Sequence, residues 1–254
     1  MLYLIGLGLS EKDLSLKAFE LLFKINNIFV DTYTNYFDFD LLWLEKELNK
    51  KVIQLSREDI EKRPIFLDMA IDQDVAILVS GDPLVATTHT DILLRAKKKG
   101  IKTKIFHASS IYSAIAETGL HIYRFGKTAS IPFPEENFFP KSFYDVILEN
   151  KGRNLHTMLL LDVKKENNLF MNPKDAMEIL KSIDEDCNIQ DIIIISRISH
   201  DSQRIIYGDI DELLKFNAEF YGRPPHTLVV PATLHFAEEE YLISLAEIYK
   251  NTKN

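Results

Sequence analysis

The feature that most constrains the fold is a repeated alternation of short apolar runs with amphipathic stretches along the first part of the chain. Runs of strand length and strand-like composition occur at residues 2–5, 27–33, 51–55, 74–79 and 101–106. Helical periodicity occupies residues 39–48, 56–70 and 90–99 between them. Because parallel strands need crossover connections, this order predicts an α/β unit with a mostly parallel sheet covered by helices on both faces.

The second part of the chain follows a more mixed order. Strands are expected at 127–133, 155–163, 191–198 and 226–230, with residues 204–207 pairing back as a hairpin. Helices are expected at 142–150, 209–216 and 237–250, and another begins at Asn172-Pro173, a favourable cap followed by a favourable first-turn proline. We therefore expect an amino-terminal α/β domain at 1–120 and a mixed α/β domain at 121–254.

Composition excludes several classes of function. The 38 acidic and 30 basic residues give a formal net charge of −8, which opposes binding to a polyphosphate, so no direct nucleic-acid binding is expected. Cys187 is the single cysteine, so neither an intramolecular disulfide nor a cysteine-based metal cluster is expected, and a reducing cytoplasm fits best. We expect no export and no membrane anchor, since the amino terminus has no basic leader and no apolar run approaches ~18 residues.

The glycine turn after the first strand is one candidate for ligand binding. Gly6 and Gly8 allow a tight turn and the close approach of a ligand. The third glycine of a dinucleotide fingerprint is missing, because Leu, Ser and Glu occupy 9–11. Ser10 and Asp13 have the spacing of an approximate capping box for the next helix. A purely structural turn is equally compatible with this fragment.

The segment from Val79 to His89 is a stronger candidate. An apolar strand there runs into Ser-Gly-Asp-Pro-Leu-Val-Ala-Thr-Thr-His, which combines an acid, a proline and several hydroxyl groups in one loop. Such a loop is suited to a rigid polar pocket. The alternative is a turn and a helix cap, with Thr87, Thr88 or Thr90 as the capping residue.

Other polar segments adjoin further strands. Residues 107–111, His-Ala-Ser-Ser-Ile, follow the strand at 101–106 and are expected beside the Val79 to His89 loop, at the edge where α/β proteins bind ligands. Alternatively, Ser109 or Ser110 only begins the helical stretch that follows. In the second half, Leu161-Asp162 and Pro224-Pro225-His226 place polar atoms beside apolar strands. His226 is either a cofactor contact or an interior histidine with satisfied hydrogen bonds.

Three of these segments together resemble the diphthine synthase family of the tetrapyrrole methylase superfamily. They are Leu-Tyr-Leu-Ile-Gly-Leu-Gly-Leu at 2–9, Gly-Asp-Pro-Leu-Val-Ala-Thr-Thr-His at 81–89 and Pro-Pro-His-Thr-Leu at 224–228. The resemblance extends along nearly the whole chain, and the loop at 133–137 is closer to the archaeal branch. It implies two α/β domains of the tetrapyrrole-methylase type with a cleft for S-adenosylmethionine between them, in a cytoplasmic homodimer.

The resemblance also implies a set of cofactor contacts, many of them through backbone atoms. Carried over position by position, they are Leu9, Asp82, Val85, Ser110, Ile111, Leu161, Ile198 and His226. Where the family commonly reads His-Asn-Ala-Ser-Ile, this chain has His-Ala-Ser-Ser-Ile at 107–111, so an asparagine side chain is missing. The stretch between Ile198 and His226 is a few residues longer than usual, which ranks Ile198 last among these assignments.

The implied activity is successive N-methylation of 2-(3-amino-3-carboxypropyl)histidine on translation elongation factor 2 to diphthine, with S-adenosylhomocysteine as the other product. Methyl transfer from a sulfonium is an in-line displacement with a neutral leaving group, so positioning in a dry site is the main requirement and no metal is expected. Asp82, Thr87, Thr88 and His89 are expected nearest the reacting centre. His89 either accepts a proton or orients the substrate, and no dedicated general base is identifiable.

Two other functions stay open at this point. One is a methyltransferase of the same fold that acts on a small molecule, a tetrapyrrole or corrin precursor, because fold alone does not separate the two. The other is a non-catalytic nucleotide-binding or scaffolding protein, which only the altered segment at 107–111 favours. The basic run at 97–99 is either a docking surface for a protein substrate or a set of charges that favour a helix carboxyl end.

Overall fold

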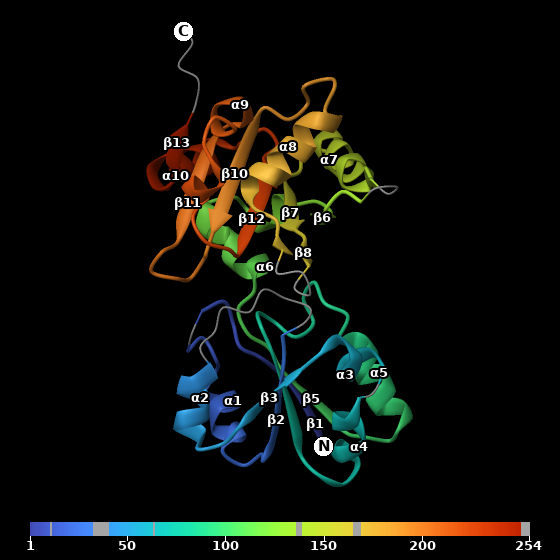
Figure 1. Ribbon diagram of the computed structural model, residues 1–254. Coiled ribbons are helices and arrows are strands. Elements are labelled where there is room, and N and C mark those ends of the chain that lie inside the picture. Colours follow the sequence, from blue (N-terminus) through green and yellow to red (C-terminus); the bar gives the residue numbers. More distant parts are fainter. Residues whose placement is uncertain (11, 33–40, 63, 136–138, 165–168, 250–254) are drawn as a thin grey trace. The chain divides into compact units, whose positions relative to one another are not determined.

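The computed structural model describes residues 1–249 except 11, 33–40, 63, 136–138 and 165–168. Tyr33, Phe39 and Lys250 of the expected elements, and part of the 133–137 loop, lie outside the described residues. The chain forms two compact units, Met1–Ala114 and Ile115–Asn254 (Figure 1). The predicted division after residue 120 lies a few residues further along the chain than the observed division after Ala114.

The first unit is built on a five-stranded sheet in the order β3-β2-β4-β1-β5, and every pair in it is parallel. The predicted parallel sheet is therefore confirmed. The central strands β1 and β4 are buried along their whole length, as expected of a sheet covered on both faces. The strands are β1 (Leu2–Gly6), β2 (Asn27–Asp31), β3 (Val52–Leu55), β4 (Val75–Val79) and β5 (Thr103–Phe106).

Helices cover both faces of this sheet (Figure 1). Successive residues of a strand point to opposite faces, so Leu4 packs into the cluster that contains Phe66 and Ile92, and Ile5 into the cluster that contains Leu22 and Leu44. The first face carries α3 (Arg57–Glu61), α4 (Ile65–Asp72) and α5 (Thr90–Lys98), and the second carries α1 (Leu16–Leu22) and α2 (Leu41–Leu48). The short helix α6 (Ile111–Ala114) follows β5.

Two predictions of helix bounds in this unit are wrong. The first helix begins at Leu16, and its cap is Ser15 rather than Ser10, since the Ser15 side chain accepts a hydrogen bond from the Ala18 amide. The single helix expected at 56–70 is two helices, α3 and α4. Pro64 stands at the start of α4 and lacks the amide donor that a continuous helix needs. The predicted cap at Ser56 is confirmed.

The second unit has a six-stranded mixed sheet in the order β13-β11-β10-β12-β7-β6. β12 is antiparallel to both β10 and β7, whereas the outer pairs β6·β7 and β11·β13 are parallel. The expected hairpin is confirmed as the antiparallel pair β10·β11. The strands are β6 (Ala129–Ile131), β7 (Thr157–Leu161), β10 (Asp191–Ser196), β11 (Arg204–Asp209), β12 (His226–Val230) and β13 (Glu247–Tyr249), and a small separate ribbon joins β8 (Val163–Lys164) to β9 (Leu169–Phe170).

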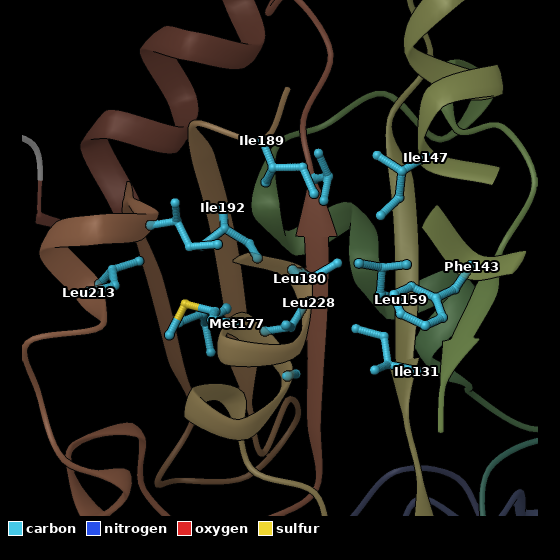
Figure 2. Close-up of a cluster of buried hydrophobic side chains, with 14 of the residues drawn as sticks. Ile131, Phe143, Ile147, Leu159, Met177, Leu180, Ile189, Ile192, Leu213 and Leu228 are labelled. Atoms are coloured by element: carbon cyan, nitrogen blue, oxygen red, sulfur yellow. The ribbon is translucent and has the colours of Figure 1, made fainter. Parts of the chain in front are cut away.

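One apolar cluster forms the core between this sheet and two helices, α7 (Ser142–Gly152) and α8 (Pro173–Ile183) (Figure 2). Phe143 and Ile147 from α7 and Met177 and Leu180 from α8 lie in it with Leu228 of β12. The predicted start of α8 is confirmed, with Asn172 and Asp175 in a reciprocal capping box. The remaining elements are the helices α9 (Ile210–Leu213) and α10 (Phe236–Leu245) and 3-10 turns at Ile115–Thr118, Ile122–Arg124 and Ala218–Tyr221.

The end of the chain differs from the prediction of one helix at 237–250. α10 ends at Leu245, and Glu247–Tyr249 forms β13 against β11. Two interactions favour the strand, because the Arg204 guanidinium binds both carboxylate oxygens of Glu247 at 2.7 Å and Tyr249 packs edge-on against Phe216 and Phe220. The expected helix at 209–216 is also shorter and ends at Leu213. No helix within the described ranges is long and apolar enough to cross a membrane.

Candidate functional site

The carboxyl ends of β4, β1 and β5 lie side by side in the first unit. Gly8 and Gly81, in the loops after β1 and β4, exchange two backbone hydrogen bonds of 2.8 and 3.2 Å. A Cβ added at Gly6 would lie 2.6 Å from the Gly81 carbonyl oxygen and 2.8 Å from the Ala108 Cβ. Only glycine therefore allows the three strand ends to approach this closely.

Asp82 joins the loop after β4 to the loop after β5. Its side chain is buried; Oδ1 accepts a hydrogen bond from the Leu84 amide at 2.9 Å, and Oδ2 accepts one from the Ala108 amide at 3.2 Å. The same Oδ2 lies 2.8 Å from Nδ1 of His107. Both carboxylate oxygens are thus engaged within the protein, and Asp82 holds the shape of the loops.

Asp13 joins the loop after β1 to the loop after β5. Its Oδ2 accepts hydrogen bonds from the Leu9 and Ser10 amides at 3.1 and 3.0 Å and from the Ser109 hydroxyl at 3.4 Å. The sequence indicated Asp13 only as part of a helix cap. Its spacing to Ser10 correctly indicated that the two residues interact, but the carboxylate binds the loop amides and does not cap the helix.

His89 is buried at the end of the Gly-Asp-Pro segment, and both of its ring nitrogens are engaged. Nε2 lies 2.8 Å from Oδ2 of Asp31, the last residue of β2, and the two side chains are 1% and 0% exposed. Nδ1 lies 3.1 Å from the Pro83 carbonyl oxygen and 2.5 Å from the Thr87 hydroxyl oxygen. Sequence patterns missed Asp31, since it was placed inside an apolar strand rather than at the end of one.

The threonines beside His89 do not cap α5. His89 occupies the cap position without a side-chain hydrogen bond to the helix, and Thr90 is the first helical residue. Thr87 is half-buried and Thr88 is exposed. Ala86 before them adopts the left-handed conformation at φ 53°, which is uncommon for a residue with a side chain and is found more often at functional sites.

The other cofactor positions expected in this unit lie on the same loops. Leu9 and Val85 are half-buried in the loops after β1 and β4. Ser110 is buried; its amide donates to the Ser113 hydroxyl at 3.2 Å, and that hydroxyl donates back to its carbonyl oxygen at 2.9 Å, just before the half-buried Ile111. The structure therefore places Leu9, Asp82, Val85, Ser110 and Ile111 at one edge of the sheet, as predicted.

The basic run at 97–99 lies elsewhere. It ends α5, which runs back from the Gly-Asp-Pro loop toward the start of β5, so these lysines are at the opposite edge of the sheet. Lys99 also pairs with Asp68 at 2.6 Å. The helix-dipole interpretation of this run fits its position, since the run lies away from the edge that carries the candidate cofactor loops.

In the second unit, Leu161, Ile198 and His226 come together at one sheet edge. β12 lies between β7 and β10 and runs opposite to both, so its first residue, His226, is beside their carboxyl ends. His226 pairs with Ser196, two residues before Ile198, and Thr227 pairs with Leu160, next to Leu161. The three expected positions are thus neighbours, although they are far apart in sequence.

His226 has an unusual environment. Both ring nitrogens are buried and have no hydrogen-bond partner within the described residues. Burial lowers the pKa of the His226 imidazole to about 4, although the Tyr221 and Gly222 carbonyls partly offset this and the charge of Arg197 adds to it. Buried polar atoms without partners are rare, so this ring is suited to contact a ligand rather than to serve as a satisfied core histidine.

Arg197 supports the segment before His226. Its guanidinium donates to the Pro224 carbonyl oxygen at 3.0 Å and to the Ser202 hydroxyl at 2.8 Å, while its amide donates to the Pro225 carbonyl oxygen at 2.9 Å. The Ser196 hydroxyl also donates to the Tyr221 carbonyl oxygen at 2.8 Å. No local sequence pattern indicates this role of Arg197, because its partners belong to a segment much further along the chain.

Comparison with known proteins identifies the class to which this fold and these loops belong. The model of the tetrapyrrole (corrin/porphyrin) methylases matches residues 1–214. The diphthine synthases of Methanococcus aeolicus and Methanocaldococcus jannaschii are each 40% identical to this chain, over 97% of it and over 98% and 99% of their own lengths. A solved diphthine synthase superposes with a TM-score of 0.88 at 34% identity, covering 97% of this chain and 96% of that one.

A second solved structure, a putative diphthine synthase from Entamoeba histolytica, gives a TM-score of 0.87 at 33% identity and covers 99% of both chains. The fold and the site thus define a methyltransferase of the tetrapyrrole methylase class, a class that uses S-adenosylmethionine as methyl donor. Within that class, the chain belongs to the diphthine synthase family, the S-adenosylmethionine-dependent methyltransferases of diphthamide biosynthesis.

The close approach of the strand ends can be tested with a matched pair of glycine variants. Gly6→Ala places a Cβ against the Gly81 carbonyl and Ala108, and we expect it to lower the free energy of unfolding by roughly 1–3 kcal/mol and to weaken cofactor binding. In Gly152→Ala the new Cβ meets no atom within 4 Å at the end of α7, so stability stays equal or rises by up to about 1 kcal/mol. Denaturant titration and calorimetry measure both effects, and equal behaviour of the two variants would contradict the packing argument.

The environment of His226 predicts its titration. Its pKa of about 4 in the folded protein lies below the ordinary value of 6.5, so between these two pH values the unfolded chain binds more protons than the folded one. This group therefore makes the protein less stable as pH falls from 6.5 to 4 and contributes no pH dependence above 6.5. NMR titration of the ring, assigned with His226→Asn, is expected to give a midpoint near 4; a midpoint near 6.5 would refute the desolvated environment.

Proposed function

We propose that this protein methylates the amine of 2-(3-amino-3-carboxypropyl)histidine on translation elongation factor 2, producing diphthine and S-adenosylhomocysteine. The observation that carries the proposal is the near-full-length similarity to proteins named diphthine synthases, at 40% identity. The Gly81 to His89 loop, with its two accessible threonines, adds support because it lies at the ligand edge of the first sheet. We further propose that three methyl groups are added in succession.

The residues present fit S-adenosylmethionine as the cofactor. Gly81 leaves space beside the loop after β4, since an added Cβ there would meet only the Ser109 carbonyl oxygen at 4.0 Å, and the His226 ring has two buried nitrogens that lack partners in the described part of the chain. When bound, the cofactor supplies a methyl group activated by a positive sulfur. The contacts that we propose are Leu9, Asp82, Val85, Ser110 and Ile111 from the first unit and Leu161, Ile198 and His226 from the second.

The residues near the proposed acceptor position have different roles. Asp82 and Asp13 fix the loops, since their oxygens accept hydrogen bonds from loop amides. His89 is buried with both nitrogens engaged, so the ring itself does not offer a free nitrogen to a substrate. The hydroxyl groups of Thr87 and Thr88 are the groups of this loop that we propose to meet the acceptor amine.

The alternative of a tetrapyrrole or corrin precursor as acceptor is not favoured, because the relatives that match this chain over nearly its full length are named diphthine synthases. A non-catalytic role rested on the changed segment at 107–111. That segment still holds the Asp82 contacts through His107 Nδ1 and the Ala108 amide, so the change does not disrupt the loop.

The decisive experiment incubates the protein with labelled S-adenosylmethionine and elongation factor 2 that carries the aminocarboxypropyl-histidine. Mass spectrometry of the modified peptide is expected to show three added methyl groups. Factor with an unmodified histidine and uroporphyrinogen serve as control acceptors and are expected to gain none. If the modified peptide gains no methyl group, the proposed function is wrong.

The cofactor site has a separate test by calorimetry. His226→Ala is expected to weaken binding of S-adenosylmethionine by roughly tenfold or more, the scale of one lost hydrogen bond in a buried site. His235→Ala is the matched control, since this exposed histidine caps α10 in the same unit.

We also propose a cytoplasmic homodimer. Sedimentation equilibrium that gives twice the monomer mass of 29.3 kDa would support the dimer.

A further inference from the structure

The buried pair of His89 and Asp31 has no assigned role in methyl transfer, and its geometry indicates one. We propose that Thr87, His89 and Asp31 form a proton relay that accepts the proton released by the acceptor amine, with Thr87 as the member that meets the substrate. This inference rests on the proposed function, because it requires an amine acceptor. It concerns the general base, for which the sequence left open whether His89 accepts a proton or orients the substrate.

The need for such a group follows from the chemistry of the product. A primary ammonium carries three N–H bonds and a trimethylammonium carries none, so one proton leaves the nitrogen for every methyl group added. Because the lone pair of the amine attacks the methyl carbon, that proton has to leave before each attack. A positioned base contributes about 10²–10⁴-fold to steps of this kind.

The partners of His89 favour one position for the hydrogen of the neutral ring. When ionised, the Asp31 carboxylate only accepts hydrogen bonds, so Nε2 at 2.8 Å carries that hydrogen and Nδ1 is the basic nitrogen; the Pro83 carbonyl oxygen near Nδ1 also only accepts, so it becomes a partner once Nδ1 is protonated. The Thr87 hydroxyl lies 2.5 Å from Nδ1, within donating distance. This is the arrangement of carboxylate, imidazole and hydroxyl that activates a hydroxyl oxygen in other enzymes.

The surroundings also stabilise the ring after it takes a proton. With both nitrogens protonated, Nε2 donates to Asp31 and Nδ1 can donate to the Pro83 carbonyl oxygen at 3.1 Å. The cation is thus formed beside a buried carboxylate and an acceptor that are already in place, so little reorganisation is needed.

The position of Thr87 makes it the outer end of the relay. His89 and Asp31 are almost fully buried, whereas Thr87 is only half-buried. Ala86, immediately before Thr87, adopts the left-handed conformation at φ 53°. This conformation is strained for a residue with a side chain, and the loop maintains it in the turn that positions Thr87. The Thr87 hydroxyl oxygen also accepts a hydrogen bond from the His89 amide at 3.3 Å, which holds the hydroxyl group beside the His89 ring.

Each proton transfer along the relay breaks one bond to hydrogen and forms another. An N–H bond of the substrate ammonium breaks and an O–H bond forms at Thr87, while the original O–H bond of Thr87 breaks and an N–H bond forms at Nδ1 of His89. The amine keeps the electron pair with which it attacks the methyl carbon. Before the next round, the proton returns through Thr87 to solvent. Thr87 is the catalytic residue in this scheme, and His89 and Asp31 are positioning residues that act through it.

The test compares two isosteric threonine variants in the methylation assay with elongation factor 2 that carries the aminocarboxypropyl-histidine. Thr87→Val removes the hydroxyl, and we expect kcat to fall by about 100-fold with little change in the affinity for S-adenosylmethionine. Thr87→Ser keeps the hydroxyl and is expected to restore most of the rate. Thr90→Val is the control, because Thr90 is exposed on the first turn of α5, and its rate is expected to equal that of the wild type.

A second measurement does not depend on activity. The ¹⁵N shifts of the His89 ring at neutral pH are expected to show a protonated Nε2 and an unprotonated Nδ1, with the Nδ1 signal moved in Thr87→Val. A ring with Nδ1 protonated in the resting enzyme would overturn the relay, as would a Thr87→Val enzyme with wild-type kcat; in both cases the proposed function stands. If the wild type itself adds no methyl group, the proposed function falls and the relay falls with it.

Discussion

The close backbone approach at the end of β1 is the constraint on which the first unit depends. Gly6 leaves no room for a side chain between the Gly81 carbonyl and Ala108, and Gly8 and Gly81 exchange two backbone hydrogen bonds across the neighbouring loops. Three polar loops are thereby brought to one edge of a parallel sheet. That edge is where the strand carboxyl ends of α/β proteins form ligand sites.

Carboxylates then fix the loops that the glycines bring together. Asp13 and Asp82 accept hydrogen bonds from loop amides, and Asp31 is buried against His89. A buried charge is costly unless it is paired and hydrogen-bonded, and the two buried carboxylates, Asp31 and Asp82, each lie 2.8 Å from a histidine ring nitrogen. Some of the acidic residues of this chain therefore hold loop backbone in place, and do not serve to repel or attract other molecules.

The second unit reaches a comparable edge by a different topology. β12 runs opposite to β7 and β10, so its first residue lies beside the carboxyl ends of both. His226 is placed there with two buried nitrogens that no described residue satisfies, while Arg197 holds the prolines before it. A polar ring left without partners weakens the fold, and its presence beside Leu161 and Ile198 is understandable if a ligand completes its hydrogen bonds.

The sequence by itself determined the features that depend on neighbouring residues. The alternation of apolar runs specified the parallel sheet, Ser56 and Asn172 specified helix starts, and the Gly-Asp-Pro segment specified a polar loop after a strand, because caps, turns and periodicity act over a few residues. Tertiary structure alone decided the pairing of His89 with Asp31, 58 residues apart, and the support of His226 by Arg197. It also turned residues 247–249 from a predicted helix into a strand, since β11 and Arg204 supply hydrogen bonds and charge that the local sequence does not contain.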